Sequence, residues 1–471
     1  MLTTLLRDSR ALATLAVPLI LTQLAQVALT TTDTLMMGLL GTQELAAGGL
    51  AIVIFNQLRT MGVGLVTSVG NQIAAAAARA EQTEEKGDHE EVRGIVRASL
   101  AVATLAGIAG AVLMILIGQA LTWLGQDAAV VERTRTLLIA LAPGLLPCLW
   151  FQAIRQFTVG MRRPQALLQI TIASIAVNAG LNWVLIHGTW GLPRLGLTGI
   201  GVATSTVYLL SFVALYVSAK KDRELAPLLT LNAAKADPAT VKRLISLGVP
   251  IAATYGSEAG FFSITALMAG SFGPAALAAH TAVNQLVYIV FQVAVGLSHA
   301  ASINVSRELA LGRTDDARRI KNTALACAAA VMTVVGIAYL ALPQLVLAPF
   351  LDSGSGSGSD QALTIATHLL IVTAFLQFFD CAQNIGVGLL RGLDDTKSGF
   401  RITLIGYWAV GLPASWLLAY ALGLDTLGIW LGLLIGLATT AVLLLRRYSA
   451  SLTVRAGLMN ARAAQPRQVP G

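Results

Sequence analysis

Three acidic residues lie inside long apolar stretches of this 471-residue chain: Asp33, Glu258 and Asp380. A charged group in hydrocarbon costs several kcal/mol, about 2.5 or more on insertion scales. A chain that keeps three such acids must neutralise them, hydrate them in a cavity or bind cations with them. The pattern therefore predicts a transporter rather than a membrane anchor.

Polar residues accompany two of these acids at helical spacing. Gln383 and Asn384 follow Asp380 by three and four residues, so they share its face of a helix. Glu258 follows Tyr255, Gly256 and Ser257, and small polar residues of this kind let helices approach closely. We expect both acids to stand on polar helix faces.

A second polar pair, Asn178 and Asn182, is also spaced four apart and shares one helix face. Buried acids next to such groups are suited to bind a proton or a sodium ion, with Glu258 and Asp380 as the candidate sodium ligands. The alternative is a structural acid paired with Arg59 or Arg155, and this alternative applies most directly to Asp33. The two asparagines would then serve as hydrogen-bonding residues between helices.

Other residues are candidates for lining a cleft. Aromatic rings attract flat lipophilic cations through cation–π contact, although most aromatic residues in apolar helices serve packing. The candidates beyond those already named are Phe261, Phe262 and Gln285.

The composition predicts an all-α polytopic membrane protein. Hydrophobic residues make up 55% of the chain and charged residues 12%, whereas soluble domains have about 25% charged residues. Stretches of membrane-spanning length recur twelve times. They lie near residues 12–37, 45–72, 95–119, 134–158, 165–187, 196–219, 243–270, 278–303, 320–343, 361–388, 398–420 and 427–446.

Several other function classes lack the residues they need. The chain has no G-x-x-x-x-G-K-[ST] segment for ATP, no H-E-x-x-H, and no metal-ligand spacing among its three cysteines. We therefore predict no enzyme activity and no cofactor apart from a coupling ion. The net charge of +8 comes from basic residues in alternate loops, which membrane topology explains without a nucleic-acid partner.

The distribution of Lys and Arg predicts the orientation. Loops after the even-numbered stretches carry the basic residues, so both termini should be cytoplasmic. Arg7 and Arg10 before the first apolar run resemble a signal peptide, but the run is long enough to be an uncleaved first transmembrane helix. Ser353–Ser359, which alternates Ser and Gly, is predicted to be a flexible external loop.

The chain repeats itself at an offset of 232 residues. Val17 and Pro18 fall on Val249 and Pro250, and further matched pairs are Gly38–Gly270, Gly41–Gly273, Gly64–Gly296, Gly160–Gly392 and Gly196–Gly428. Six helices per half imply a parallel repeat around an axis along the membrane normal. The predicted division is an N-lobe (1–220), a cytoplasmic linker (221–242), a C-lobe (243–447) and a cytoplasmic tail (448–471).

Local motifs add a resemblance to a known family. Four segments resemble motifs of one family of membrane proteins. They are Thr32-Asp33-Thr34-Leu35-Met36-Met37-Gly38, Gly248-Val249-Pro250-Ile251 with Glu258, Asn178-Ala179-Gly180-Leu181-Asn182-Trp183, and Asp380 with Leu390-Arg391-Gly392-Leu393-Asp394-Asp395. The family that they resemble is the multidrug and toxic compound extrusion (MATE) family. The similarity is to its bacterial NorM-type branch.

The resemblance implies two lobes around a cleft. It also implies a bacterial inner-membrane monomer that exports cationic lipophilic drugs and dyes in antiport with protons or sodium ions. It assigns coupling to Asp33, Glu258 and Asp380. Leu376 departs from the family pattern, because some members carry a Tyr at this position. The chain therefore lacks one possible cation ligand, which modestly favours protons over sodium as the coupling ion. The alternative function is a lipid-linked precursor flippase of the same superfamily, which would need a basic cleft.

Overall fold

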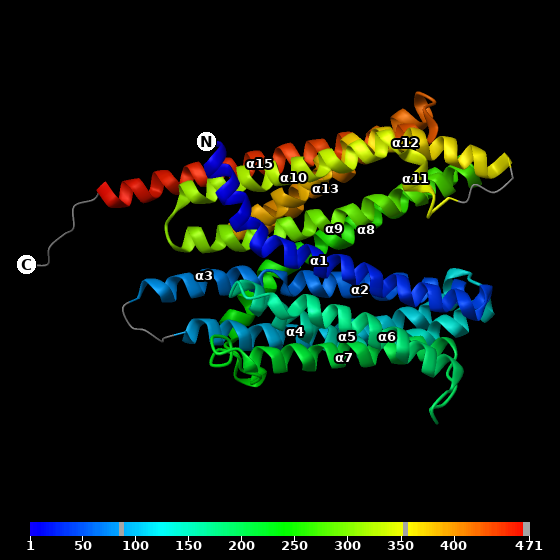
Figure 1. Ribbon diagram of the computed structural model, residues 1–471, viewed down its shortest axis with the longest axis horizontal. Helices are drawn as coiled ribbons and strands as arrows, with labels where there is room; N and C mark the ends of the chain where they lie inside the picture. The colour runs from blue at the N-terminus through cyan, green and yellow to red at the C-terminus, as the bar shows by residue number, and fades with distance from the viewer. Residues whose placement is uncertain (84–88, 352–356, 465–471) are drawn as a thin grey trace, which may run out of the picture. The chain divides into compact units, whose positions relative to one another are not determined.

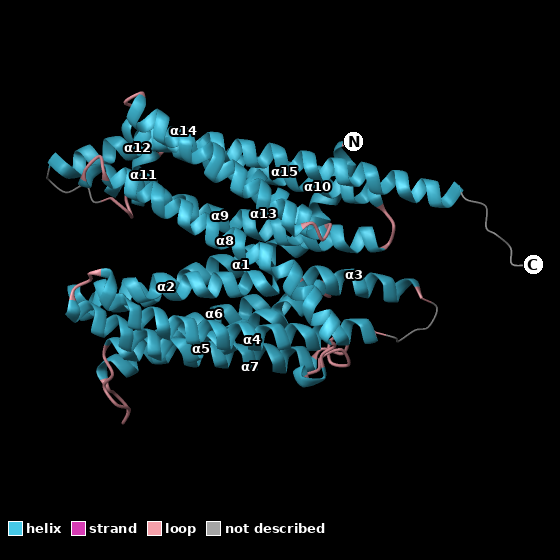
Figure 2. Cartoon of the chain, turned by 180° about the vertical axis from the view of Figure 1, so that it is seen from behind, coloured by secondary structure: helices cyan, strands magenta, loops and turns pink. Residues whose placement is uncertain are grey.

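The computed structural model describes residues 1–83, 89–351 and 357–464, and all of their regular elements are helical. The elements of the first half are α1 (Leu2–Leu40), α2 (Thr42–Thr67), α3 (Val69–Gln82), α4 (Glu90–Ala120), α5 (Ala128–Gly160), α6 (Gln165–His187) and α7 (Leu197–Lys221) (Figure 1). Those of the second half are α8 (Pro238–Gly270), α9 (Pro274–Ala310), α10 (Thr314–Ala341), α11 (Pro343–Leu347), α12 (Ser357–Gly392), α13 (Thr396–Leu404), α14 (Leu412–Trp416) and α15 (Asp425–Ala464) (Figure 2).

The helices confirm the predicted class of fold. Among the described residues, eleven helical segments are long and apolar enough to cross a membrane. The predicted span at 243–270 falls in α8, which has 33 residues and is therefore also long enough, but it is interrupted by Tyr255, Ser257 and Glu258. All twelve predicted stretches are thus helical.

The described chain packs into two compact units. The first unit contains Met1–Ala16 and Gly260–Gly471, and the second contains Val17–Ala259. The boundaries between them fall inside α1 and α8 rather than in the segment 221–242 that we expected to link the lobes. The predicted lobe limits stay a prediction.

The internal repeat is visible in the geometry of equivalent glycines. Gly41 and Gly273 precede α2 and α9 with φ angles of 135° and 109°, which L-residues rarely adopt. Gly160 lies against the Gly70 carbonyl oxygen in the second unit, and Gly392 lies against the Ser302 carbonyl oxygen in the first. A Cβ atom would approach these two oxygens to 2.7 and 3.0 Å, so both positions need a small residue for helix contact.

Three local expectations differ from the structure. Most of the predicted loop Ser353–Ser359 lies outside the described residues, but residues 357–359 already belong to α12. The predicted tail is helical as far as Ala464, because α15 continues from its apolar part into a polar one. The span predicted at 398–420 is irregular, since π-helical segments at Ile405–Gly411 and Leu417–Ala421 separate its α-helical parts.

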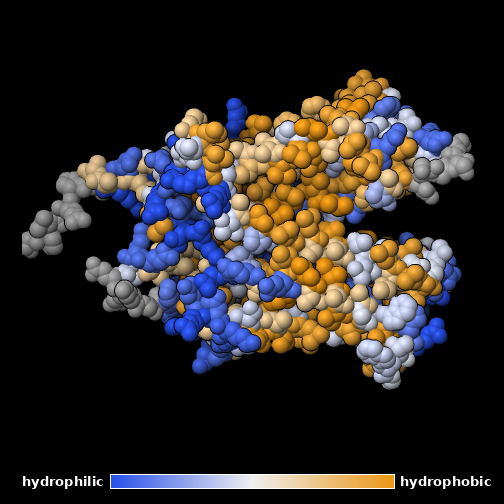
Figure 3. Space-filling view, in the orientation of Figure 1, coloured by the Kyte–Doolittle hydropathy of each residue, from blue (hydrophilic) through white to orange (hydrophobic). Residues whose placement is uncertain are grey.

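Each unit has its own apolar core, and hydrophilic side chains gather toward the ends of the helices (Figure 3). At one end of the second unit, Arg163 after α5 contacts Asp222 after α7 at 2.8 Å. At one end of the first unit, Arg447 of α15 contacts Asp395 before α13 at 3.1 Å. The loops that carry the basic residues therefore meet at a common end within each unit.

Candidate functional site

Asp33 lies at the centre of a buried hydrogen-bond network in the second unit. Its carboxylate Oδ1 accepts from Asn178 Nδ2 at 2.7 Å and from Asn182 Nδ2 at 2.9 Å. Its Oδ2 accepts from Thr204 Oγ1 at 3.2 Å. All four residues are buried, with Asp33 8% exposed and the two asparagines 0%. Three helices, α1, α6 and α7, thus converge on one carboxylate.

Helix periodicity explains the convergence on Asp33. Asn178 and Asn182 are four residues apart on α6, so their side chains stand one turn apart on the same face. Thr204 lies on α7, which packs beside α6. The sequence indicated the two asparagines. It gave no signal for Thr204, because a single hydroxyl in an apolar helix usually bonds to its own backbone.

The network leaves oxygen acceptors available. Within the part of the chain that the structure describes, Asn178 Oδ1 and Asn182 Oδ1 are buried without a hydrogen-bond partner. The amide nitrogens of these asparagines face the Asp33 carboxylate, and their amide oxygens are left for another donor or a cation. Buried acceptors of this kind need a partner. The arrangement can hold a proton on Asp33 or bind a small cation at its carboxylate.

Asp33 is not paired with an arginine in this structure. Among the described residues it forms no ion pair, and all of its side-chain hydrogen bonds come from neutral groups. Arg155 is buried on α5, where its Nη1 contacts Gln152 Oε1 at 3.5 Å. The structural alternative for Asp33, a salt bridge with Arg59 or Arg155, is therefore absent from the described contacts of Asp33.

Asp380 has a sparser environment in the first unit. It lies on α12 and is 8% exposed. Asn384, one turn along, donates from Nδ2 to Asp380 Oδ1 at 3.3 Å and to the Asp380 backbone oxygen at 2.9 Å. Gln383 accepts from the Tyr407 hydroxyl at 3.3 Å. The predicted polar face thus exists, but only Asn384 bonds to the carboxylate.

Glu258 is half-buried on α8 and belongs to the second unit, whereas Asp380 belongs to the first. Its neighbour Tyr255 packs its ring against Gly64 of α2, at 3.0 Å from the Cβ position of that glycine. Glycine at this position lets α8 and α2 approach closely. The sharing of one ion by Glu258 and Asp380 stays a prediction.

The residues predicted to line a cleft divide into buried core residues and half-buried ones. Phe261 is 0% exposed and stacks on Tyr407 with ring centroids 4.9 Å apart. Phe262 is half-buried and meets Phe261 edge-on. Gln285 is half-buried on α9 and makes no side-chain hydrogen bond among the described residues. Phe261 is a core residue, so Phe262 and Gln285 are the better candidates for contact with a substrate.

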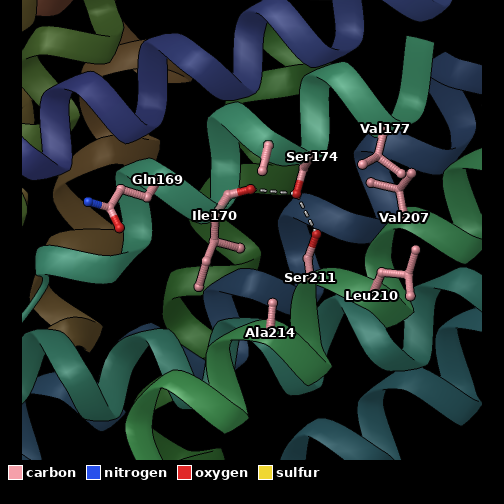
Figure 4. Close-up of a pocket in the computed structure, with 9 residues that line it drawn as sticks. Gln169, Ile170, Ser174, Val177, Val207, Leu210, Ser211 and Ala214 are labelled. Carbon is pink, nitrogen blue, oxygen red and sulfur yellow. Dashed lines mark hydrogen bonds between the residues drawn. The ribbon is translucent and has the colours of Figure 1, made fainter. Parts of the chain in front are cut away.

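A mainly apolar cavity of about 280 Å³ lies along α6 and α7 (Figure 4). At its wall the hydroxyls of Ser174 and Ser211 point toward each other and lie 2.7 Å apart, while Ser174 also bonds to the Ile170 carbonyl oxygen. Ser174 is one turn from Asn178. The polar seam between α6 and α7 therefore extends beyond Asp33.

Comparisons with known proteins decide the family. The family model described as MatE matches residues 18–184 and 250–417. The chain belongs to the MatE family. The two matches begin 232 residues apart, which confirms the duplication predicted from the glycine and proline positions.

Relatives with similar sequences cover nearly the whole chain. A protein of Bradyrhizobium diazoefficiens named probable multidrug resistance protein NorM is 36% identical, over 92% of this chain and 91% of its own length. A protein of the same name from Pseudomonas aeruginosa is 34% identical, over 92% of this chain and 88% of its own.

Solved structures of MatE-type proteins share the fold. A MATE structure in the bent conformation superposes with a TM-score of 0.85 at 15% identity, covering 97% of this chain and 98% of the other. The eukaryotic MATE transporter AtDTX14 gives a TM-score of 0.79 at 20% identity, covering 96% of this chain and 98% of the other.

Proposed function

We propose that this MatE-family chain is a secondary transporter that exports cationic lipophilic drugs and dyes in exchange for protons or sodium ions. The observation that carries the proposal is the Asp33 carboxylate, which is buried and bonded only to neutral groups. Such a site keeps a negative charge that a cation can neutralise. The relatives named as multidrug resistance proteins support the substrate class.

In this proposal Asp33, Glu258 and Asp380 alternate between the coupling ion and the cationic substrate. Competition for the same charge is sufficient for exchange, because the bound ion then lowers the affinity for the drug. Asn178 and Asn182 hold the Asp33 carboxylate by donating hydrogen bonds to it. Asn384 and Gln383 supply polar groups beside Asp380. Tyr255, Phe262 and Gln285 contact the drug.

The predicted topology belongs to the same proposal. Basic loops meeting at one end of each unit support a multi-pass protein of the bacterial cytoplasmic membrane with both termini inside. The lobes at 1–220 and 243–447 would act as the two halves of an alternating-access transporter, working as a monomer.

Dye efflux from proteoliposomes tests this proposal. Proton and sodium gradients are imposed separately, and wild type is compared with Asp33→Asn, Asp380→Asn and the control Asp360→Asn. Asp360 is an exposed acid in the first turn of α12. We expect wild type and the control to respond to the same ion, and the two buried variants to lose that response. Gradient-independent dye movement in wild type would contradict the proposal.

A flippase for lipid-linked precursors is the second candidate, and Arg155 favours it. Its Nε and Nη2 atoms are buried and have no hydrogen-bond partner among the residues that the structure describes. A guanidinium with unused donors is suited to a phosphate. Binding of a prenyl diphosphate to wild type, lost in Arg155→Gln, would support this function. Dye export that Arg155→Gln leaves intact would support the first.

A further inference from the structure

Two side chains near the middle of α12 and the end of α10 carry three buried polar atoms without a hydrogen-bond partner among the described residues. Gln377 lies three residues before Asp380 on α12, and Tyr339 lies near the end of α10. These side chains are 2% and 4% exposed. Gln377 Oε1, Gln377 Nε2 and Tyr339 Oη have no hydrogen-bond partner among the described residues. Buried amides and hydroxyls in this state require a partner, usually a bound water or ion.

The two side chains face each other across a tight helix contact. Gly336 of α10 lies against Ala374 of α12, with its Cβ position 3.5 Å from the Ala374 oxygen. Side chains on a helix lean toward its N-terminus, and α10 and α12 run in opposite directions. Tyr339 and Gln377 therefore lean toward each other, and the tyrosine hydroxyl and the amide interact without reaching hydrogen-bond geometry.

Helix spacing connects this polar pair to the acid. Gln377, Asp380 and Asn384 stand at positions i, i+3 and i+7, so they form one stripe along α12. Gln377 lies on the side of Asp380 nearer the start of α12, and Tyr339 lies near the end of α10. In the predicted topology these helix ends face the outside. Gln377 and Tyr339 thus lie on the side of Asp380 that the predicted topology turns toward the outside.

The internal repeat shows that the fold does not require these polar groups. The positions equivalent to Tyr339, Gln377 and Asp380 in the second unit are Gly107, Leu145 and Cys148. Those residues pack as apolar core, with Gly107 against Leu146 and Leu145 against Gly110. At these three positions the same helix pair packs without a hydroxyl, an amide or an acid. Their joint presence in the first unit indicates a local role.

We propose that Tyr339 and Gln377 hold water that passes the coupling cation from the outer side to Asp380. The Gln377 amide oxygen and the Tyr339 hydroxyl oxygen accept hydrogen bonds from the water around the ion or bind the ion directly. The Gln377 amide nitrogen donates a hydrogen bond to the same water. The inference rests on the proposed coupling function of Asp380.

The first test compares Gln377→Leu and Tyr339→Phe with the control Thr373→Val in the proteoliposome assay. Thr373 lies one turn earlier on α12, is equally buried, and bonds to the Leu369 oxygen. We expect Gln377→Leu to raise the external cation concentration for half-maximal efflux about tenfold, the effect of losing one hydrogen bond to a charged species. Tyr339→Phe, which removes one oxygen atom, should give a smaller rise in the same direction, while dye binding without a gradient stays unchanged.

The outcomes separate this inference from the proposed function. If both variants match Thr373→Val in cation dependence while Asp380→Asn abolishes coupling, the inference is overturned and the proposed function stands. If Asp380→Asn exports normally, the coupling role of Asp380 itself fails. A loss of dye binding in Gln377→Leu with unchanged cation dependence would also overturn the inference.

A second measurement does not depend on transport or on the folding of variants. Hydroxyl radicals generated from bound water label buried side chains beside that water. In wild type we expect Tyr339 to be labelled several-fold faster than Tyr448, which is 0% exposed and donates its hydroxyl to the Ala317 oxygen. Equal labelling of the two tyrosines would show that Tyr339 has no water and would overturn the inference.

Discussion

Asp33 and Asp380 are equally buried, but they differ in the hydrogen bonds that they accept from the surrounding helices. Asp33 on α1 accepts three hydrogen bonds, and all three come from other helices. Asp380 on α12 accepts one side-chain hydrogen bond, and it comes from Asn384 on the same helix at 3.3 Å. The first carboxylate is thus held by other helices, whereas the second, among the described residues, accepts a side-chain hydrogen bond only from its own helix.

The repeat sharpens the comparison. Asp33, Asn178, Asn182 and Thr204 are equivalent to Thr265, Val410, Ala414 and Gly436 in the other unit. There the Thr265 hydroxyl bonds to the Phe262 oxygen of its own helix. One duplicated architecture therefore supports a polar network in one copy and apolar packing in the other. The fold sets the positions, and substitutions within it create the chemistry.

The largest expected effect separates the two acids by stability. Asp33→Ala removes the acceptor of three buried donors and should cost about 3 kcal/mol, because each unpaired buried donor is expensive. Asp380→Ala leaves one donor and should cost about 1 kcal/mol or less. Thermal unfolding of the two variants in detergent measures the difference. Equal losses would break the comparison.

The next effect tests what the two units share. Gly160→Ala and Gly392→Ala each place a methyl group against a neighbouring helix, within 2.7–2.8 Å of its atoms, and should each cost about 2 kcal/mol. Gly94→Ala is the control, since its Cβ position has no heavy atom within 4 Å. The same unfolding assay applies. If Gly160→Ala lowered the stability and Gly392→Ala did not, the two units would differ in how well they accommodate an added methyl group.

A smaller effect probes one arm of the Asp33 network. Thr204→Val keeps the shape of the side chain but removes its donor to Asp33 and should lower stability by about 1 kcal/mol. Thr206→Val is the matched control, because the Thr206 hydroxyl bonds to the Val202 oxygen of its own helix. We expect the dye-efflux rate to fall only in Thr204→Val. Identical behaviour of both variants would remove Thr204 from the site.

The smallest effect lies at the end of the second unit. Partial burial raises the pKa of the Asp222 carboxyl, but the hydrogen bond from Arg163 and other contacts lower it, and the net pKa is below its usual value. A lowered pKa stabilises the fold above the usual aspartate pKa, about 3.9, and this stability is lost as the pH falls. Arg163→Gln should therefore cost about 0.5 kcal/mol at pH 7 and less as the pH falls through the lowered pKa of Asp222, in unfolding measured at pH 7 and at acidic pH.

The sequence by itself determined the class of fold, the twelve helical stretches and the duplication. These properties follow from local composition, because a span needs about 20 apolar residues whatever its neighbours are. The duplication was evident from matching glycine and proline positions, since these two residue types directly determine the local backbone geometry. The acids and the asparagine pair were also evident, because a polar residue in an apolar helix stands out.

Tertiary structure decided which of these residues meet. Asn178 and Asn182 are about 145 residues from Asp33 in the chain, and no helical periodicity relates them. Thr204, Gln377 and Tyr339 were missed for the same reason: each is unremarkable in its own helix. A hydroxyl becomes part of a site, or a buried amide lacks a partner, only when the packing of neighbouring helices determines which donors and acceptors lie within reach.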